Sequence, residues 1–220
     1  MAMFKSGDRA IKAGSDLFVL GESRDAIYYL LGGWVHLYKL VEDGRRQILH
    51  FALPGAVLGF PPTRSGMTYS AQALTDATIS IIPRDNLSAM FREHPEIAMR
   101  FAWLVSRDRS LAYEHLSSVG RRTGRQRVAH LLLELFVRCR MQWPGHHGEE
   151  MHLPLTQEHI GDTTGLTGVH VNRVLRDLRR ERIVEFHYRR LRVLDPDKLV
   201  DAAGVDPQLM FSWIPRDAPD

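Results

Sequence analysis

Cysteine is nearly absent from this sequence: Cys139 is the single one among 220 residues. One thiol cannot close a disulfide within the chain, and it cannot supply the cysteine ligands of an iron–sulfur cluster. We therefore expect neither a disulfide framework nor such a cluster. Because Cys139 stands in the apolar segment LLLELFVRCRM, we expect a small buried helix residue there; a redox-sensing thiol is the alternative.

Long hydrophobic runs are missing too. No apolar stretch approaches the roughly 20 residues that a membrane-spanning helix needs. The N-terminal MAMFKSGDRAIK lacks the apolar core of a signal peptide. We therefore expect no membrane partner and a cytoplasmic location.

The motifs of common enzyme classes are also absent. The sequence has no Gly-x-Ser-x-Gly elbow, no Walker loop and no glycine-rich dinucleotide fingerprint after a strand. Glu149 and Glu150 are adjacent, whereas the two carboxylates of an acid–base pair face each other across a cleft. We therefore expect a binding protein and no enzyme.

Positive charge is concentrated in one half of the chain. The whole sequence has a net charge of +3, but residues 120–194 contain 14 arginines, no lysine and 8 acidic residues, a net of +6. The remainder therefore carries −3. A basic half beside a mildly acidic half suggests one module for a polyanion and another for something else. Arginine also suits two-pronged contacts to phosphate or to guanine edges.

The segment from Leu155 to Leu178 predicts two short helices joined by a tight turn. Thr156 can cap the first helix, Gly165 ends it, and Thr167 can cap the second. The inner face of the second helix is expected at four apolar positions with helical spacing: Val171, Val174, Leu175 and Leu178. Its opposite face would present polar and basic groups to a DNA major groove, which predicts a helix-turn-helix. An ordinary helix pair with a solvated basic face is the alternative.

A wing is expected directly after this pair of helices. Short strands fit around Phe186 and Leu191, with a hairpin tip at Tyr188-Arg189-Arg190, where arginines can meet phosphate. This layout predicts a winged helix-turn-helix that binds double-stranded DNA. The residues expected to contact DNA are Thr167, Val169, His170, Asn172, Arg173, Arg176, Arg180, Arg189 and Arg190.

The first half of the chain predicts short strands separated by turn signals. The expected strands are Asp16–Val19, Ala26–Leu31, Gly33–Leu40, Arg46–Phe51, Val57–Gly59, Ser70–Ala73 and Ala77–Ile82. Asp43-Gly44 between two of them is typical of a hairpin. This spacing favours a small antiparallel roll or barrel.

Two helices should follow the strands, over Asp85–Glu93 and from Pro95 to about Val119. The longer one carries a row at positions three and four apart: Phe101, Leu104, Asp108, Leu111, His115 and Ser118. We expect this row to form a two-helix seam in a homodimer. Two DNA-binding units roughly 34 Å apart would then match a palindromic site. Packing of the row on its own domain is the alternative.

This order of elements resembles the Crp/Fnr superfamily of bacterial transcription regulators, the relatives of the cyclic-AMP receptor protein. The similarity spans about Arg9 to Leu199 and rests on three segments: DLFVLGESRDAIYYLLGGWVHLYKL, HLSSVGRRTGRQRVAHLLLEL and LPLTQEHIGDTTGLTGVHVNRVLRDLRRERIVEF. It implies an α+β fold: an antiparallel β-roll sensor domain of the cyclic-nucleotide-binding kind (1–94), a dimerisation helix (95–119) and a winged helix-turn-helix domain (120–220).

The resemblance also implies a function. We expect a homodimeric, sequence-specific transcription regulator whose β-roll senses an unidentified signal. A ligand-independent regulator of the same fold, or a small-molecule binding module that never engages DNA, are the alternatives. Arg173 occupies the family's base-reading arginine position, but Val169 stands where a glutamate is usual. A valine can contact a thymine methyl instead, so the operator should differ, with His170 and Asn172 as further base readers.

The effector pocket departs further from the family. That pocket uses a Gly-Glu pair for ribose and an Arg-Ser or Arg-Thr pair for the phosphate. Here Gly59 precedes Phe60, and Tyr69 precedes Ser70. A cyclic phosphate without its cation faces a large desolvation penalty, so cyclic AMP is disfavoured. With Arg64 as a substitute cation, the candidate pocket residues are Gly59, Phe60, Arg64, Tyr69 and Ser70.

Two other sets of residues could bind a metal or haem, but we expect neither set to do so. PGHHGEEMH holds His146, His147, Glu149, Glu150 and His152, but we expect a solvated linker and no metal. By resemblance, this segment lies where family members touch RNA polymerase. His36, His50 and His115 are possible haem ligands, but we expect histidines satisfied by their neighbours. We therefore expect no cofactor.

Overall fold

The computed structural model describes residues 3–61, 66–140 and 149–207. The chain divides into two compact units, Met1–Arg109 and Ser110–Asp220. The division falls inside one long helix, α2 (Pro95–Arg121). The domain boundaries at residues 94 and 119 remain predictions. Among the described residues, no helix has the length and apolarity needed to cross a membrane.

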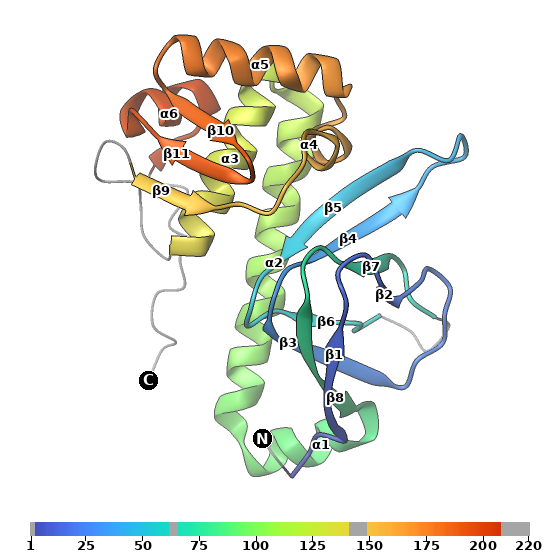
Figure 1. The fold of residues 1–220 in the computed structure, drawn as a ribbon. Coiled ribbons are helices and arrows are strands. Elements are labelled where there is room, and N and C mark those ends of the chain that lie inside the picture. The colour runs from blue at the N-terminus through green and yellow to red at the C-terminus, as the bar shows by residue number, and fades with distance from the viewer. Residues whose placement is uncertain (1–2, 62–65, 141–148, 208–220) are drawn as a thin grey trace. The chain divides into compact units, whose positions relative to one another are not determined.

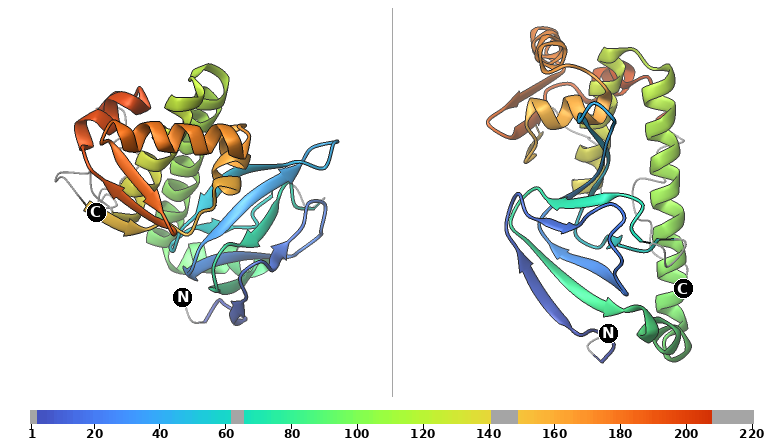
Figure 2. Two further views of the ribbon diagram at one scale, coloured as in Figure 1. Left: turned by 45° about the horizontal axis from the view of Figure 1, so that its top comes forward. Right: turned by 90° about the vertical axis from the view of Figure 1, so that its right-hand side faces the viewer.

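The first unit is an antiparallel β-roll of two four-stranded sheets, ordered β1-β8-β3-β6 and β2-β7-β4-β5. The sheets face each other around a shared apolar core (Figure 2). The strands are β1 (Gly7–Ile11), β2 (Asp16–Phe18), β3 (Ala26–Gly32), β4 (Val35–Leu40), β5 (Arg46–Ala52), β6 (Val57–Leu58), β7 (Ser70–Ala73) and β8 (Ala77–Pro83). The roll predicted from the sequence is confirmed, and β1 is an added strand.

Alternating side chains build this core. In β3, Tyr28 and Leu30 point inward and are buried with Val35 of the facing sheet. Turns fix the register, because Gly44 has a φ of +81° between β4 and β5, as the hairpin prediction requires. Gly33 has a φ of +83°, and a Cβ atom there would lie 2.4 Å from the carbonyl oxygen of Asp76. Only glycine fits this turn.

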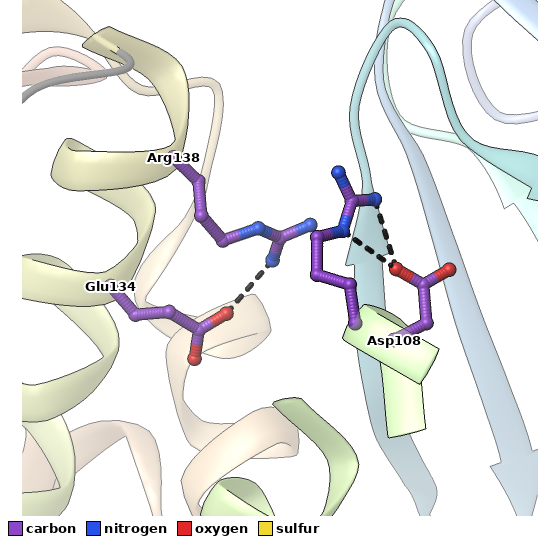
Figure 3. Close-up of polar contacts among 4 residues, drawn as sticks. Asp108, Glu134 and Arg138 are labelled. Carbon is purple, nitrogen blue, oxygen red and sulfur yellow. Dashed lines mark hydrogen bonds and ion pairs between the residues drawn. The ribbon is translucent and has the colours of Figure 1, made fainter. Parts of the chain in front are cut away.

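Two helices complete the first unit. Helix α1 (Arg84–Glu93) buries Leu87 and Met90 against Ile27 and Ile82 of the sheet. Helix α2 then begins at Pro95, a residue well suited to the first turn of a helix. Its Arg107 and Asp108 side chains form an ion pair with an N–O distance of 2.9 Å (Figure 3).

The second unit surrounds α3 (Gly124–Arg140), whose residues from Val128 to Arg138 are all buried. Helices α4 (Gln157–Thr164), α5 (Gly168–Arg180) and α6 (Pro196–Ala203) pack on it (Figure 1). A three-stranded sheet, ordered β10-β11-β9, completes the unit. Its strands are β9 (Glu149–His152), β10 (Val184–His187) and β11 (Arg190–Val193).

Two groups in α3 are buried despite their polarity. Glu134 and Arg138 form an ion pair at 2.8 Å, one turn apart on the same helix (Figure 3). Burial raises the pKa of the Cys139 thiol to about 12. Cys139 itself is half-buried, so the burial expected from the sequence is only partial. A thiol with that pKa is protonated at neutral pH, which disfavours a reactive thiolate.

Candidate nucleic-acid interface

Helices α4 and α5 form the predicted helix-turn-helix. Thr156 caps α4: its Oγ1 accepts from the backbone N–H of His159, and the His159 ring accepts from the backbone N–H of Thr156, both at 3.2 Å. Gly165 ends the helix in the left-handed conformation, with a φ of 69°. A Cβ atom on Gly161 would lie 2.6 Å from the carbonyl oxygen of Leu166, so glycine lets the turn close tightly.

Helix α5 is oriented as the sequence predicts. Thr167 caps it by accepting from the backbone N–H of His170 at 3.3 Å. Its four apolar positions, Val171, Val174, Leu175 and Leu178, are all buried. On the opposite side Val169 is 83% exposed, and Asn172, Arg173 and Arg176 are exposed as well. This outward face of α5 is therefore free to enter a groove.

The arginines of this face differ in their partners. Arg173 and Arg176 make no ion pair with any described residue. Arg180 pairs with Asp177 at 3.0 Å. An unpaired guanidinium needs no internal contact to be broken before it binds DNA. Arg173 and Arg176 are thus the arginines most readily available on this face.

The other two predicted base readers are already engaged. The side-chain amide of Asn172 donates to Gln157 Oε1 at 3.2 Å. The His170 ring lies against the start of α3, because a Cβ atom on Gly124 would be 2.8 Å from its Nε2. His170 is only partly exposed. Its role in base reading remains a prediction that this packing does not favour.

The wing is a two-residue hairpin between β10 and β11, which pair His187 with Arg190. Its tip residues Tyr188 and Arg189 have φ values of 49° and 60°. Positive values at both positions are those of a type I′ turn, which asparagine and glycine usually occupy. Tyr188 is 98% exposed and was not among the predicted contacts, although its place at the tip pointed to it.

The predicted wing arginines fall in two environments. Arg189 is exposed at the tip and makes no ion pair with any described residue. Arg190 is the first residue of β11 and pairs with Glu150 of β9. The segment Glu149–His152 is thus a strand, so the linker interpretation is wrong for these residues. His146 and His147 lie outside the described residues. No cluster of His, Cys, Asp or Glu suited to a metal occurs among the described ones.

The predicted dimer seam on α2 remains a prediction that the structure does not favour. Leu104, Leu111 and Ser118, three of its six positions, are buried within the single chain. Phe101 packs on Phe91 and Phe60, and Asp108 binds Arg107. His115 is mostly buried, and desolvation lowers its pKa.

The row one residue further along α2 has the same spacing and faces outward. It consists of Ala102, Val105, Arg109, Ala112, Leu116 and Val119, all exposed except the partly exposed Val119. Leu116 is 70% exposed. Positions alternating three and four apart are those of a coiled-coil seam. We call this row the outer seam.

The described residues of the predicted effector pocket contact one another and their neighbours in the β-roll. Tyr69 is half-buried, desolvation raises its pKa, and its hydroxyl accepts from the backbone N–H of Gly59 at 3.4 Å. The Tyr28 and Tyr69 rings lie 5.7 and 5.6 Å from the Phe18 ring. Ser70 Oγ accepts from the backbone N–H of Leu20 at 2.9 Å.

The outer residues of that pocket point elsewhere. Phe60 stacks edge-on against Phe101 at 5.2 Å and lies under the Arg84 guanidinium at 5.0 Å. Arg64 lies outside the described residues. The role of the five positions as an effector pocket remains a prediction. The expected absence of haem remains a prediction.

Comparisons with known proteins match both units. The chain fits the family model for a cyclic nucleotide-binding domain over residues 8–94 and that for a Crp-like helix-turn-helix domain over residues 126–202. It is 30% identical over 198 residues to the nitrogen fixation regulation protein FixK of Rhizobium meliloti, covering 88% of this chain and 87% of that protein. It is 33% identical over 182 residues to the transcriptional activatory protein AadR of Rhodopseudomonas palustris, covering 83% and 75%.

A solved structure agrees with this fold. The structure of FixK2 from Bradyrhizobium japonicum superposes with a TM-score of 0.79 and 27% identity, covering 91% of this chain and 98% of that one. The two structures therefore share the order of β-roll, long helix and winged helix-turn-helix.

Proposed function

Since this chain belongs to the Crp/Fnr superfamily of DNA-binding transcription regulators, we propose that it acts as a homodimer on an inverted-repeat operator. The observation that carries this proposal is the outward face of α5. Arg173 and Arg176 stand there exposed, without ion pairs to described residues, on a helix whose other side is anchored in the core. Arg173 would read a guanine edge, and Val169 would contact a thymine methyl.

The wing would supply contacts that do not depend on sequence. Arg189 at the exposed tip would contact a backbone phosphate of the DNA. Arg190 would contact a phosphate once its ion pair with Glu150 breaks. Tyr188 and Arg189 hold positive φ values that glycine would adopt more easily. Local strain of this kind is often found at functional sites, which supports a role in DNA contact for the two side chains.

The outer seam would hold the second copy of this chain. From Ala102 to Val119 it extends over about 26 Å of helix, enough for several layers of a two-stranded coiled coil. Arg109 interrupts its apolar positions, and a charged residue at one seam position fixes the register of such pairs while weakening them. Two winged units held this way would match the two halves of a palindrome.

The oligomeric state tests this seam. Leu116→Glu places a charge in the outer seam, whereas Ser117→Glu adds the same charge to the exposed neighbouring position. We expect sedimentation equilibrium to show dimers for wild type and Ser117→Glu and a large shift to monomers for Leu116→Glu. Equal behaviour of the two variants would contradict the proposed dimer.

A ligand-independent regulator is a second candidate, favoured by the contacts of Tyr69. By sequence position, this half-buried tyrosine stands where the family's phosphate-binding arginine is expected, and its hydroxyl accepts from the backbone N–H of Gly59. Calorimetric titration with cyclic nucleotides should therefore give no heat of binding, while DNA binding proceeds without them. Cyclic-nucleotide binding accompanied by tighter DNA binding would reject this candidate in favour of a sensor.

We also propose RNA polymerase as a partner, since relatives carry the names of transcriptional activators. Run-off transcription from a template bearing the operator should then rise when the chain is added. Inhibition at every operator position would instead indicate a repressor.

A further inference from the structure

A surface cleft of about 570 Å³ lies in the second unit, where the end of α5, the wing sheet and the start of α6 come together. Four cationic residues line it, Arg179, Arg182, Arg192 and Lys198, together with the carboxylates of Glu185 and Asp195. We call it the arginine cleft. Its volume is within the range of sites that hold small molecules.

Two of the four cations are neutralised inside the cleft. Arg179 Nε lies 3.7 Å from Glu185 Oε1, and Lys198 Nζ lies 2.9 Å from Asp195 Oδ2. The other two, Arg182 and Arg192, make no ion pair with any described residue. The arginine cleft therefore has an excess of two positive charges on two guanidinium groups.

Arg192 makes no ion pair with a described residue, although two carboxylate side chains lie on the neighbouring strands. Arg192 pairs in register with Glu185 on one side and Glu150 on the other. Yet Glu185 pairs with Arg179, and Glu150 pairs with Arg190. Both neighbouring carboxylates are thus committed to other arginines, which leaves the Arg192 guanidinium available to an outside anion.

The backbone of Arg182 gives an independent indication. Arg182 follows Glu181, the C-cap residue of α5, and has a φ of 56°. The backbone N–H of Arg182 donates to the carbonyl oxygen of Arg179 at 3.0 Å. The backbone N–H of Ile183 donates to the carbonyl oxygen of Leu178 at 2.9 Å. This is the helix-ending motif in which glycine normally takes the left-handed position. An arginine held in that strained position suggests that its side chain is used.

We propose that the arginine cleft binds a phosphoanion, with Arg182 and Arg192 as its two ligands. A guanidinium group donates two parallel N–H bonds to phosphate oxygens, and two such groups balance a dianion. The cleft is separate from the base-reading surface, because none of the residues predicted to contact DNA lines it. Arg179, the residue of α5 that does line it, comes six residues after Arg173, a rise of about 9 Å along the helix. The phosphate would belong either to a small molecule or to the DNA backbone beyond the operator.

Pyrophosphate is the first probe. It is titrated calorimetrically into the full chain without DNA, at constant ionic strength set with chloride. We expect Arg182→Gly and Arg192→Gln to weaken pyrophosphate binding at least tenfold. Arg121→Gln removes an exposed arginine of the same unit outside the cleft. This control should stay within twofold of wild type.

The glycine variant also guards against a folding artefact. Arg182→Gly should raise the melting temperature without ligand, because glycine adopts a positive φ without strain. A stabilised variant that no longer binds pyrophosphate has lost a ligand-binding residue and not its fold. Loss of stability in Arg182→Gly would remove the strain argument for the site.

A DNA arm identifies the source of the phosphate. Wild type and both cleft variants are compared on a minimal operator duplex and on the same duplex extended on each side. If the variants lose more affinity on the extended duplex, the phosphate belongs to flanking DNA; if only pyrophosphate binding falls, it belongs to a small molecule. The proposal is overturned if the cleft variants match wild type in both arms. Since the pyrophosphate arm uses no DNA, it stands even if the proposed homodimer on a palindrome fails.

Discussion

Replacing Arg173 with alanine should weaken binding to the cognate half-site by about 1–3 kcal/mol, the value of a two-pronged contact to guanine. Every 1.4 kcal/mol is a tenfold change, so the loss is roughly 5- to 150-fold. In a homodimer both half-sites lose the contact, and distant losses add, so a full inverted repeat should lose about twice that free energy.

The structure indicates that this loss would come from DNA binding alone. Arg173 is exposed on α5 and makes no ion pair with a described residue, so its truncation breaks no internal contact. Alanine is also the best helix former. The free energy of unfolding should therefore change by less than about 0.5 kcal/mol, the usual range for such surface sites.

Arg189→Ala is the matched comparison, since it removes an exposed arginine from the wing tip. A phosphate contact carries no sequence information, so this variant should weaken specific and random DNA alike and lower the salt slope by about 1. Fluorescence anisotropy across a salt series measures both effects. If Arg173→Ala and Arg189→Ala lower affinity equally on both kinds of DNA, the division between base reading and phosphate contact is refuted.

Three further changes test other parts of the structure. Gly33→Ala should destabilise the β-roll by several kcal/mol, because the added Cβ atom clashes with Asp76. Gly14 has a similar φ of 82° but open space around it, so Gly14→Ala should lower the free energy of unfolding by only about 1–2 kcal/mol. Equal losses of the two variants in urea unfolding would contradict the clash. Because the pKa of Cys139 is raised to about 12, alkylation at pH 8 should be slow in the folded chain and fast in urea, and equal rates would show an accessible thiolate. Above pH 9 the unfolded thiol ionises while the folded one does not, so stability should fall between pH 9 and 12. Arg109→Leu should tighten the dimer, as seen by sedimentation at low concentration, since it completes an apolar outer seam; unchanged dissociation would place Arg109 outside the interface.

Local signals were sufficient for most of the secondary structure. Asp43-Gly44 located the hairpin between β4 and β5, and Thr156, Gly165 and Thr167 located the ends of α4 and α5, because caps and turns depend on neighbouring residues. The outward face of α5 followed from its apolar positions alone, since a helix has a fixed period and the core must take one side.

What the sequence could not decide, or missed, depended on contacts between residues that are distant in the sequence. Along α2, the rows through Leu104 and through Val105 have identical spacing, so periodicity could not decide which one meets the chain's own core. Tyr69 was identifiable as a departure from the family pattern, but only the fold shows its hydroxyl bound to Gly59. The strand β9 was missed because its pairing partner, β11, lies about 40 residues further along the chain.

Selection of bound sequences from a random DNA pool by the full chain tests the central claim most directly. Two copies of α5 facing outward from one dimer predict an inverted repeat whose half-site centres lie about 10–10.5 base pairs apart, near 34–36 Å. With Arg173→Ala, the repeat should keep its symmetry but lose its base preference at one position of each half-site. Enrichment of a single asymmetric site, or no enrichment at all, would contradict the account.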